Sequence, residues 1–243
     1  MTTLGIETST AVCGVAIVEN DAIVAEHWCE ENRMHSEKLV AMIDQALHDA
    51  NRTLSACDAI AISIGPGSFS GLRIGLSVAK GVSLASDLPL AAVPTLYALA
   101  YRSLMQKQLR SRDRVLAMID AGRDEVYTAL YEYTDDNLEE MRSPCAISLS
   151  ELDTAISSER NTIFLMGDAV EKFIAYRKKL KGSIAENVTI PPREERLCSA
   201  VAVAVVGEKL VRYGEIADLG ILEPYYIKEF STTMKHHHTE IHR

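Results

Sequence analysis

Short apolar runs separated by polar turns open the chain. They lie at 4–7, 12–18 and 22–28, and each is bounded by residues that favour turns. Runs of this length with such boundaries are typical of β-strands. Because only tight turns separate them, we expect the three strands to pair as an antiparallel meander.

A helix is predicted directly after the three strands, at 36–50. Between Ser36, a candidate N-cap, and Ala50 the apolar residues recur at intervals of three and four, which predicts an amphipathic helix. Two buried strands, each followed by a helix, are predicted next, at 59–64, 70–86, 90–93 and 95–107. This order predicts a mixed sheet whose later strands are parallel and are joined by crossover helices.

A polar junction at 110–114 separates this pattern from the rest of the chain. We expect a first lobe at 1–110, a smaller second lobe at 111–230 and a frayed tail at 231–243. Within the second lobe, apolar runs and helical spacing predict strands at 115–120, 126–133 and 163–166 and a helix at 169–180. Residues 197–213 are apolar nearly all round, which predicts a buried helix or a mixture of helix and strand.

Composition narrows the class of protein. The 243 residues carry a formal net charge of −9, which disfavours direct contact with many nucleic-acid phosphates. There is no apolar run long enough to span a membrane and no signal-peptide pattern, so we expect a cytoplasmic protein with no membrane contact. The five cysteines are far apart, which is typical of isolated thiols in a reducing compartment.

A glycine-rich loop, 65–71, lies between a predicted strand and a predicted helix. Such a loop can bind phosphate through backbone N–H groups. However, Ser70 stands where a dinucleotide fingerprint needs glycine, and the first lysine after the loop is Lys80, too late for a P-loop. A tight turn capped by serine explains the same residues, so both interpretations stay open.

The end of the first strand carries a carboxylate and hydroxyls. Phosphotransferases of the actin-like superfamily have an Asp and a Gly here, whereas this chain has Glu7 and no glycine before Gly14. Glu7, Thr8 and Ser9 could bind a polar ligand, or they could simply satisfy a strand-end turn.

Gly71, Gly75 and Ala79 are four residues apart on a predicted helix. A glycine inside a helix costs about 1 kcal/mol relative to alanine, which favours a close approach by the sheet, another helix or another subunit.

Two histidines near the end, His238 and His242, have helical spacing, but Glu240 is misplaced for a metalloprotease motif. We expect no metal site.

Five segments together resemble the TsaB (YeaZ) family of tRNA threonylcarbamoyladenosine biosynthesis proteins. They are residues 6–10, 65–75, 94–96, 117–127 and 223–227. The resemblance runs from Leu4 to about Lys228, and the glycine-rich loop and residues 120–127 are its most specific parts.

The resemblance implies an actin-like, two-lobed α/β fold of the sugar kinase, chaperone and actin superfamily. It also implies a non-catalytic subunit that binds and stabilises TsaD, aided by TsaE, in modifying adenosine 37 of tRNAs that read codons beginning with A. Contact with tRNA would be indirect. A homodimer is expected when the chain is alone.

Site residues follow from the same resemblance. It places partner contacts on the helices at 36–50 and 70–86, here represented by Leu39, Ile43, Leu47, Gly71, Arg73, Gly75 and Ala79. A degenerate nucleotide site at the partner interface would use Glu7, Thr8, Ser9, Gly65 and Gly67. No other cofactor is implied.

TsaD carries an HxxxH metal pair after the proline-containing strand, whereas residues 94–100 contain no histidine. Thr, Leu and Tyr cannot replace imidazole ligands, so we expect neither metal nor catalysis. Two alternatives remain open. One is an ATP-dependent small-molecule kinase or ATPase of the same fold, and the other is a glycoprotease-like metallopeptidase.

Overall fold

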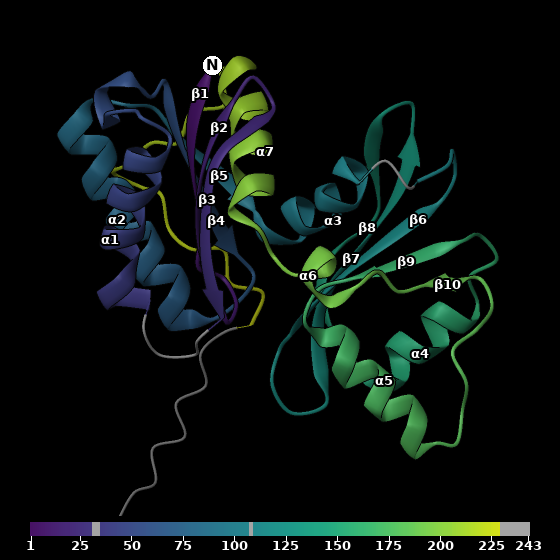
Figure 1. The fold of residues 1–243 in the computed structure, drawn as a ribbon. Coiled ribbons are helices and arrows are strands. Elements are labelled where there is room, and N and C mark those ends of the chain that lie inside the picture. Colours follow the sequence, from purple (N-terminus) through teal and green to yellow (C-terminus); the bar gives the residue numbers. More distant parts are fainter. Residues whose placement is uncertain (31–34, 107–108, 229–243) are drawn as a thin grey trace, which may run out of the picture.

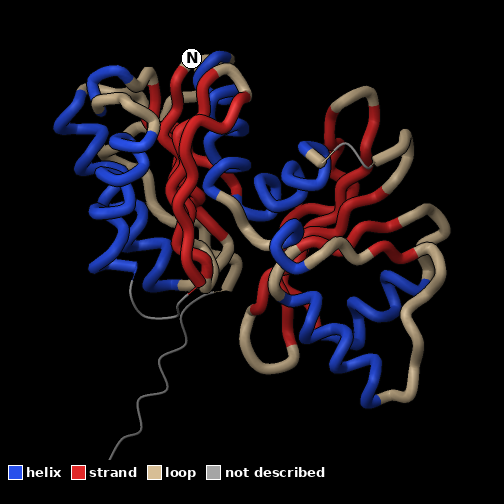
Figure 2. Tube along the Cα trace, in the orientation of Figure 1, coloured by secondary structure: helices blue, strands red, loops and turns tan. Residues whose placement is uncertain are grey.

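Two lobes, each built on its own sheet, make up the protein (Figures 1 and 2). The computed structural model describes residues 1–30, 35–106 and 109–228. The tail predicted at 231–243 therefore lies outside the described residues. Within the described part, no helix combines the length and the apolar character needed to cross a membrane.

The first sheet confirms the predicted meander and crossovers. Its strand order is β3-β2-β1-β4-β5. β1, β2 and β3 pair antiparallel, and β4 and β5 join in parallel. Asn20 and Asp21, both with positive φ, form the tight β2–β3 turn. The strands are β1 (Thr2–Glu7), β2 (Val12–Glu19), β3 (Ala22–Glu30), β4 (Ala59–Gly65) and β5 (Leu90–Pro94).

Helices cover both faces of this sheet. α1 (His35–Asp49) and α2 (Phe69–Ser86) lie side by side on one face (Figure 1). α1 begins one residue before Ser36, so this serine lies in the first turn and does not precede the helix. A short 3₁₀ helix (Leu54–Ala56) precedes β4, and α3 (Thr95–Met105) follows β5 and leads to the second lobe.

The second sheet has the order β10-β9-β6-β7-β8. The predicted strands β6 (Arg114–Asp120), β7 (Glu125–Thr134) and β9 (Ile163–Met166) and the predicted helix α5 (Ala169–Lys179) are confirmed. Four further elements were not predicted: β8 (Asn137–Ser148), α4 (Leu149–Ser157), β10 (Val188–Thr189) and α6 (Arg193–Arg196). The sequence of β8 has no apolar alternation that would predict a strand, and Leu138 is its only buried residue.

The chain returns to the first lobe after α6. Of the two possibilities left open for this segment, a buried helix or a mixture of helix and strand, the structure shows the helix α7 (Ala200–Arg212), but it packs on β1, β2, β4 and β5, not in the second lobe. A Cβ at Gly207 would lie 2.2 Å from Cβ of Ala61, so glycine permits this close packing. A helix that is apolar nearly all round is stable where it is buried on several sides. The segment predicted as the second lobe, 111–230, is therefore divided between both lobes.

Residues 217–228, here called the C-terminal strap, follow α7. The N–H of Ala217 donates to the carbonyl of Leu90, and the N–H of Tyr225 donates to the carbonyl of Ile64. At its end, Nζ of Lys228 donates to Oε2 of Glu125, at 2.7 Å, in the second lobe. The strap thus runs along the first lobe and finishes on the second.

Candidate functional site

A cleft of about 420 Å³ lies between the lobes, where several strands of both sheets end. The turn after β1 contributes Ser9 and Thr10, and the loop before α2 contributes Gly67 and Ser68. The second lobe contributes its own strand-end residues, chiefly Asp120 and Asp168. Crevices at the carboxyl ends of strands are the usual ligand sites of α/β folds, so this cleft is the first candidate.

Glu7 lies beneath the cleft and does not line it. Its side chain is 1% exposed, and Oε1 accepts hydrogen bonds from the backbone N–H and the hydroxyl of Ser9, at 2.6 and 2.5 Å. Oε2 has no partner among the described residues. Burial raises the pKa of this carboxyl to about 7. Glu7 is thus a buried structural group that lacks direct access to a ligand in the cleft.

The glycines of the loop serve contacts within the chain. A Cβ at Gly67 would lie 2.1 Å from the carbonyl oxygen of Ser9, which already accepts the N–H of Ser68. Gly65 has φ +125°, and a Cβ there would lie 2.3 Å from the carbonyl of Tyr225 in the strap. The hydroxyl of Ser68 accepts from the N–H of Gly71 as a cap of α2. The loop therefore forms the serine-capped turn that the sequence left open.

Of the five residues predicted to bind a nucleotide, only Ser9 and Gly67 lie around the cleft, and Ser9 is itself 0% exposed. Glu7, Thr8 and Gly65 are buried behind it. Because the Ser68 N–H is already bonded to Ser9, that donor is not free for a phosphate.

Two aspartates missed by sequence reasoning line the opposite wall. Oδ1 of Asp168 accepts from the N–H of Asp120 at 3.1 Å, and burial raises the pKa of Asp168 to about 6. Asp120 pairs with Nζ of Lys172 at 2.6 Å. Asp120 is the last residue of β6 and Asp168 lies two residues after β9, and this position at a strand end is the signal that could have identified them.

The lining contains no lysine or arginine, so the cleft is poorly suited to a polyphosphate. The described residues also contain no group of three His, Cys, Asp or Glu side chains arranged to hold a metal. Neither the kinase nor the metallopeptidase alternative therefore gains support from the described cleft.

The predicted partner-binding residues need correction. Leu39, Ile43, Leu47 and Ala79 belong to the core between the helices and the sheet. Gly71 and Gly75 are also buried, and a Cβ at Gly75 would lie 2.1 Å from the Thr8 hydroxyl. Amphipathic helices turn their apolar face to their own sheet, so six of the seven residues cannot contact a partner. Only Arg73 is exposed.

The opposite side of α1 and α2 is open. We call it the outer helix face, defined by Val40, Arg73, Ser77, Gly81 and Leu84. Val40 and Leu84 are 53% and 71% exposed, and nothing lies within 4 Å of a Cβ built on Gly81. Exposed apolar side chains beside small residues favour close packing by another protein.

An arginine and two rings lie where the outer helix face meets the strap. The Arg73 guanidinium lies 3.8 Å from the centroid of the Phe69 ring, and its Nε donates to the Tyr226 hydroxyl at 3.1 Å. The Phe69 and Tyr226 rings are 5.4 Å apart. Aromatic and arginine side chains are enriched in protein interfaces.

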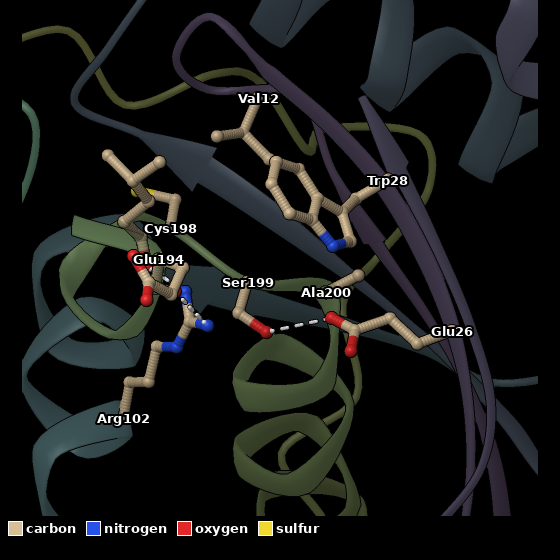
Figure 3. A pocket seen from close by; sticks show the side chains of 9 residues that line it. Val12, Glu26, Trp28, Arg102, Glu194, Cys198, Ser199 and Ala200 are labelled. Atoms are coloured by element: carbon tan, nitrogen blue, oxygen red, sulfur yellow. Dashed lines mark hydrogen bonds between the residues drawn. The ribbon is translucent and has the colours of Figure 1, made fainter. Parts of the chain in front are cut away.

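A second hollow between the lobes is too small for a metabolite (Figure 3). Its volume of about 10 Å³ has room for about one water molecule. Arg102 donates there to the carbonyls of Glu194 and Leu197, and the Ser199 hydroxyl donates to Glu26 at 3.4 Å. These contacts join α3, the approach to α7 and β3, so the hollow is a structural junction.

Known proteins that are similar to this chain belong to tRNA threonylcarbamoyladenosine biosynthesis. The family model described as TsaD, tRNA N6-adenosine threonylcarbamoyltransferase, matches residues 29–222. The tRNA threonylcarbamoyladenosine biosynthesis protein TsaB of Bacillus subtilis is 29% identical over 94% of this chain and 94% of its own length. TsaB of Buchnera aphidicola subsp. Baizongia pistaciae is 31% identical over 78% of this chain and 84% of its own.

A solved structure agrees with these relatives. YeaZ from Pseudomonas aeruginosa superposes with a TM-score of 0.75 at 27% identity, covering 93% of this chain and 99% of that one. With the sheet topology described above, the match confirms the predicted actin-like, two-lobed fold.

Proposed function

The chain belongs to the TsaB family of tRNA threonylcarbamoyladenosine biosynthesis proteins, and we propose that it acts there as a non-catalytic subunit that binds and stabilises a TsaD-like threonylcarbamoyltransferase. The observation that carries the proposal is the similarity to TsaB proteins over most of both chains. The missing histidine pair after β5 supports the non-catalytic part.

The residues around the cleft also support a non-catalytic role. Catalysis requires groups placed to touch a substrate, whereas the most perturbed carboxyl, Glu7, is buried beneath the cleft. The glycine-rich loop is held by Ser9 and by the strap. These contacts tie the loop to the turn after β1 and to the strap.

Partner binding is assigned to the outer helix face. Leu84 supplies an exposed apolar side chain, and Gly81 leaves space beside it for a partner backbone. Arg73, whose charge forms no ion pair with the described residues, can pair with a carboxylate of the partner at the strap end of this face. We extend the proposal to a homodimer through the same face when no partner is present.

Other parts of the proposal concern the assembly. TsaE would join through the TsaD-like subunit, and contact with tRNA would be indirect because this chain carries a net charge of −9. Any nucleotide would bind at the partner interface, where the other protein can supply cations that this cleft lacks. The cytoplasm is the compartment where such an assembly would act.

The test of the interface compares two leucine-to-aspartate variants. Leu84→Asp places a charge on the outer helix face, while Leu180→Asp changes a similarly exposed leucine, 58%, at the end of α5. We expect Leu84→Asp to weaken binding to the host's TsaD-like protein at least about tenfold, as loss of a hot-spot residue does. Leu180→Asp should bind like the wild type in calorimetry.

Both leucines are exposed, so neither variant should lower the thermal midpoint appreciably. Equal affinity of the wild type and Leu84→Asp would contradict the assignment of the partner to this face. Failure of the wild type to bind the TsaD-like protein would contradict the proposed function itself.

A further inference from the structure

Two of the five cysteines face each other across neighbouring strands. In the antiparallel register of β2 and β3, Cys13 is the direct partner of Cys29. Both side chains lie on the α1 side of the sheet, because Cys13 belongs to the core under α1 and Cys29 packs against that core. Both are free thiols in this structure. Cys145 lies opposite Thr128 in the register of β7 and β8, and Cys57 and Cys198 lie outside the strands.

The geometry of an antiparallel pair suits a disulfide. Directly opposed residues have Cα atoms about 4.5 or 5.5 Å apart, and disulfides span about 4.4–6.8 Å between Cα atoms. Opposed Cβ atoms are about 4.5–5.5 Å apart, slightly more than the usual disulfide distance, so a small shift of one strand is needed. β3 is an edge strand that pairs only with β2, and it can make that shift.

The two thiols differ in accessibility. Cys29 is partly exposed, whereas Cys13 is fully buried. Burial raises the pKa of the Cys13 thiol to about 12, and the neighbouring Cys29 adds to that shift. Because thiolates react with oxidants and buried thiols do not ionise readily, Cys29 is the residue that an oxidant reaches first.

We propose that Cys13 and Cys29 are a reversible oxidation site, which closes to a cross-strand disulfide when the protein meets hydrogen peroxide. The Cys29 thiolate attacks one peroxide oxygen, which gives a sulfenic acid and releases hydroxide. The Cys13 sulfur then attacks the sulfur of that sulfenic acid, and water leaves with the Cys13 proton. The two thiols lose two electrons, and the peroxide is reduced to two molecules of water.

The disulfide links the edge strand β3 to β2 beneath α1. α1 packs on both β2 and β3, and its other side contributes Val40 to the outer helix face. The cysteine pair therefore lies directly beneath α1, one of the two helices that form the outer helix face. A thiol reductant opens the disulfide and restores the form described here.

Digestion after glutamate residues tests the site. The protease cuts after Glu19 and Glu26, which separates peptide 8–19, containing Cys13, from peptide 27–30, containing Cys29. The full-length protein is treated with a small excess of hydrogen peroxide, and free thiols are alkylated in denaturant before digestion. We expect the two peptides to appear in the mass spectrum as one linked species, which disappears after reduction.

Two variants complete the test. Cys29→Ser should abolish the linked species, whereas Cys145→Ser, which changes another partly exposed cysteine, should leave its yield unchanged. Recovery of peptides 8–19 and 27–30 only as separate species, with Cys29 overoxidised or either cysteine linked elsewhere, would overturn the proposal. Recovery of both peptides from the peroxide-treated wild type with Cys13 and Cys29 alkylated and unoxidised would overturn it as well.

Discussion

Glu7 is a single buried carboxyl whose effect on the stability of the protein depends on pH. It ends β1, yet both oxygens of its carboxyl are buried and one has no partner among the described residues. A carboxyl in this position is destabilising when it is charged. Its presence therefore has a measurable cost in stability at neutral and alkaline pH.

The pH dependence of stability follows from the raised pKa. The Glu7 carboxyl has a pKa of about 7 when folded and 4.5 when exposed. Between these values the folded state binds more protons than the unfolded state, so stability falls as pH rises from 4.5 to about 7. Glu7→Gln keeps an acceptor for Ser9 and removes the charge.

We expect Glu7→Gln to be more stable than the wild type at pH 8 by up to about 3 kcal/mol, with little difference near pH 4.5. Urea unfolding at the two pH values measures this. The neighbouring carboxyl of Asp168 adds to the raised pKa of Glu7, so the difference between variant and wild type includes the repulsion between these two groups. A difference between variant and wild type that does not change with pH would show that Glu7 is not ionising as described.

Helix α2 illustrates what the sequence could and could not predict about an element. Its extent was predicted closely, because Ser68 and the apolar spacing define it. The contact that each glycine of α2 makes was not predictable. The closeness of Thr8 to Gly75, for example, depends on the conformation of the turn after β1. The same limit explains why buried residues of α1 and α2 were assigned to a partner.

Two of the three glycines of α2, Gly75 and Gly81, make a matched pair of substitutions. A Cβ at Gly75 meets the Thr8 hydroxyl at 2.1 Å, whereas nothing lies within 4 Å of one at Gly81. Gly75→Ala should therefore destabilise the protein by about 1–3 kcal/mol through overpacking. Gly81→Ala should stabilise it by about 0.5–1 kcal/mol, the usual gain in a helix interior.

Urea unfolding of both alanine variants measures the two effects under identical conditions. If Gly81→Ala were destabilising, the outer helix face would not be open at that position. If Gly75→Ala were neutral, the close approach of α2 to the β1 turn would be wrong.

Elements of the second lobe were harder to predict from sequence. β8 has one buried residue and therefore no readable alternation, although the serine–glutamate capping box that starts α4, Ser148 with Glu151, was present in the sequence. The location of α7 could not be predicted, because an apolar helix fits either lobe by composition. Its small residues, which let it lie against β4, become meaningful only with the sheet in place.

At the scale of the whole molecule, one core joins both lobes. Ala61 of the first sheet and Val115 and Phe164 of the second belong to the same buried cluster, which α3 and α7 complete. The strap adds the Lys228–Glu125 pair, and Arg193 pairs with Glu30 and Glu171 across the lobes. Exposed ion pairs contribute little, so the shared apolar core holds the lobes together.

This construction fits a subunit that supports another protein. The cleft is acidic, the outer helix face is partly apolar, and the net charge of −9 gives tRNA little attraction of its own. The effect on tRNA would therefore pass through the TsaD-like partner.

The threonylcarbamoyladenosine content of bulk tRNA, measured by mass spectrometry after depletion of this protein in its host, tests the central claim most directly. We predict that depletion lowers the modification severely, that the wild type and Leu180→Asp restore it, and that Leu84→Asp does not, although it accumulates to the same level. Unchanged threonylcarbamoyladenosine in the depleted cells would contradict the account.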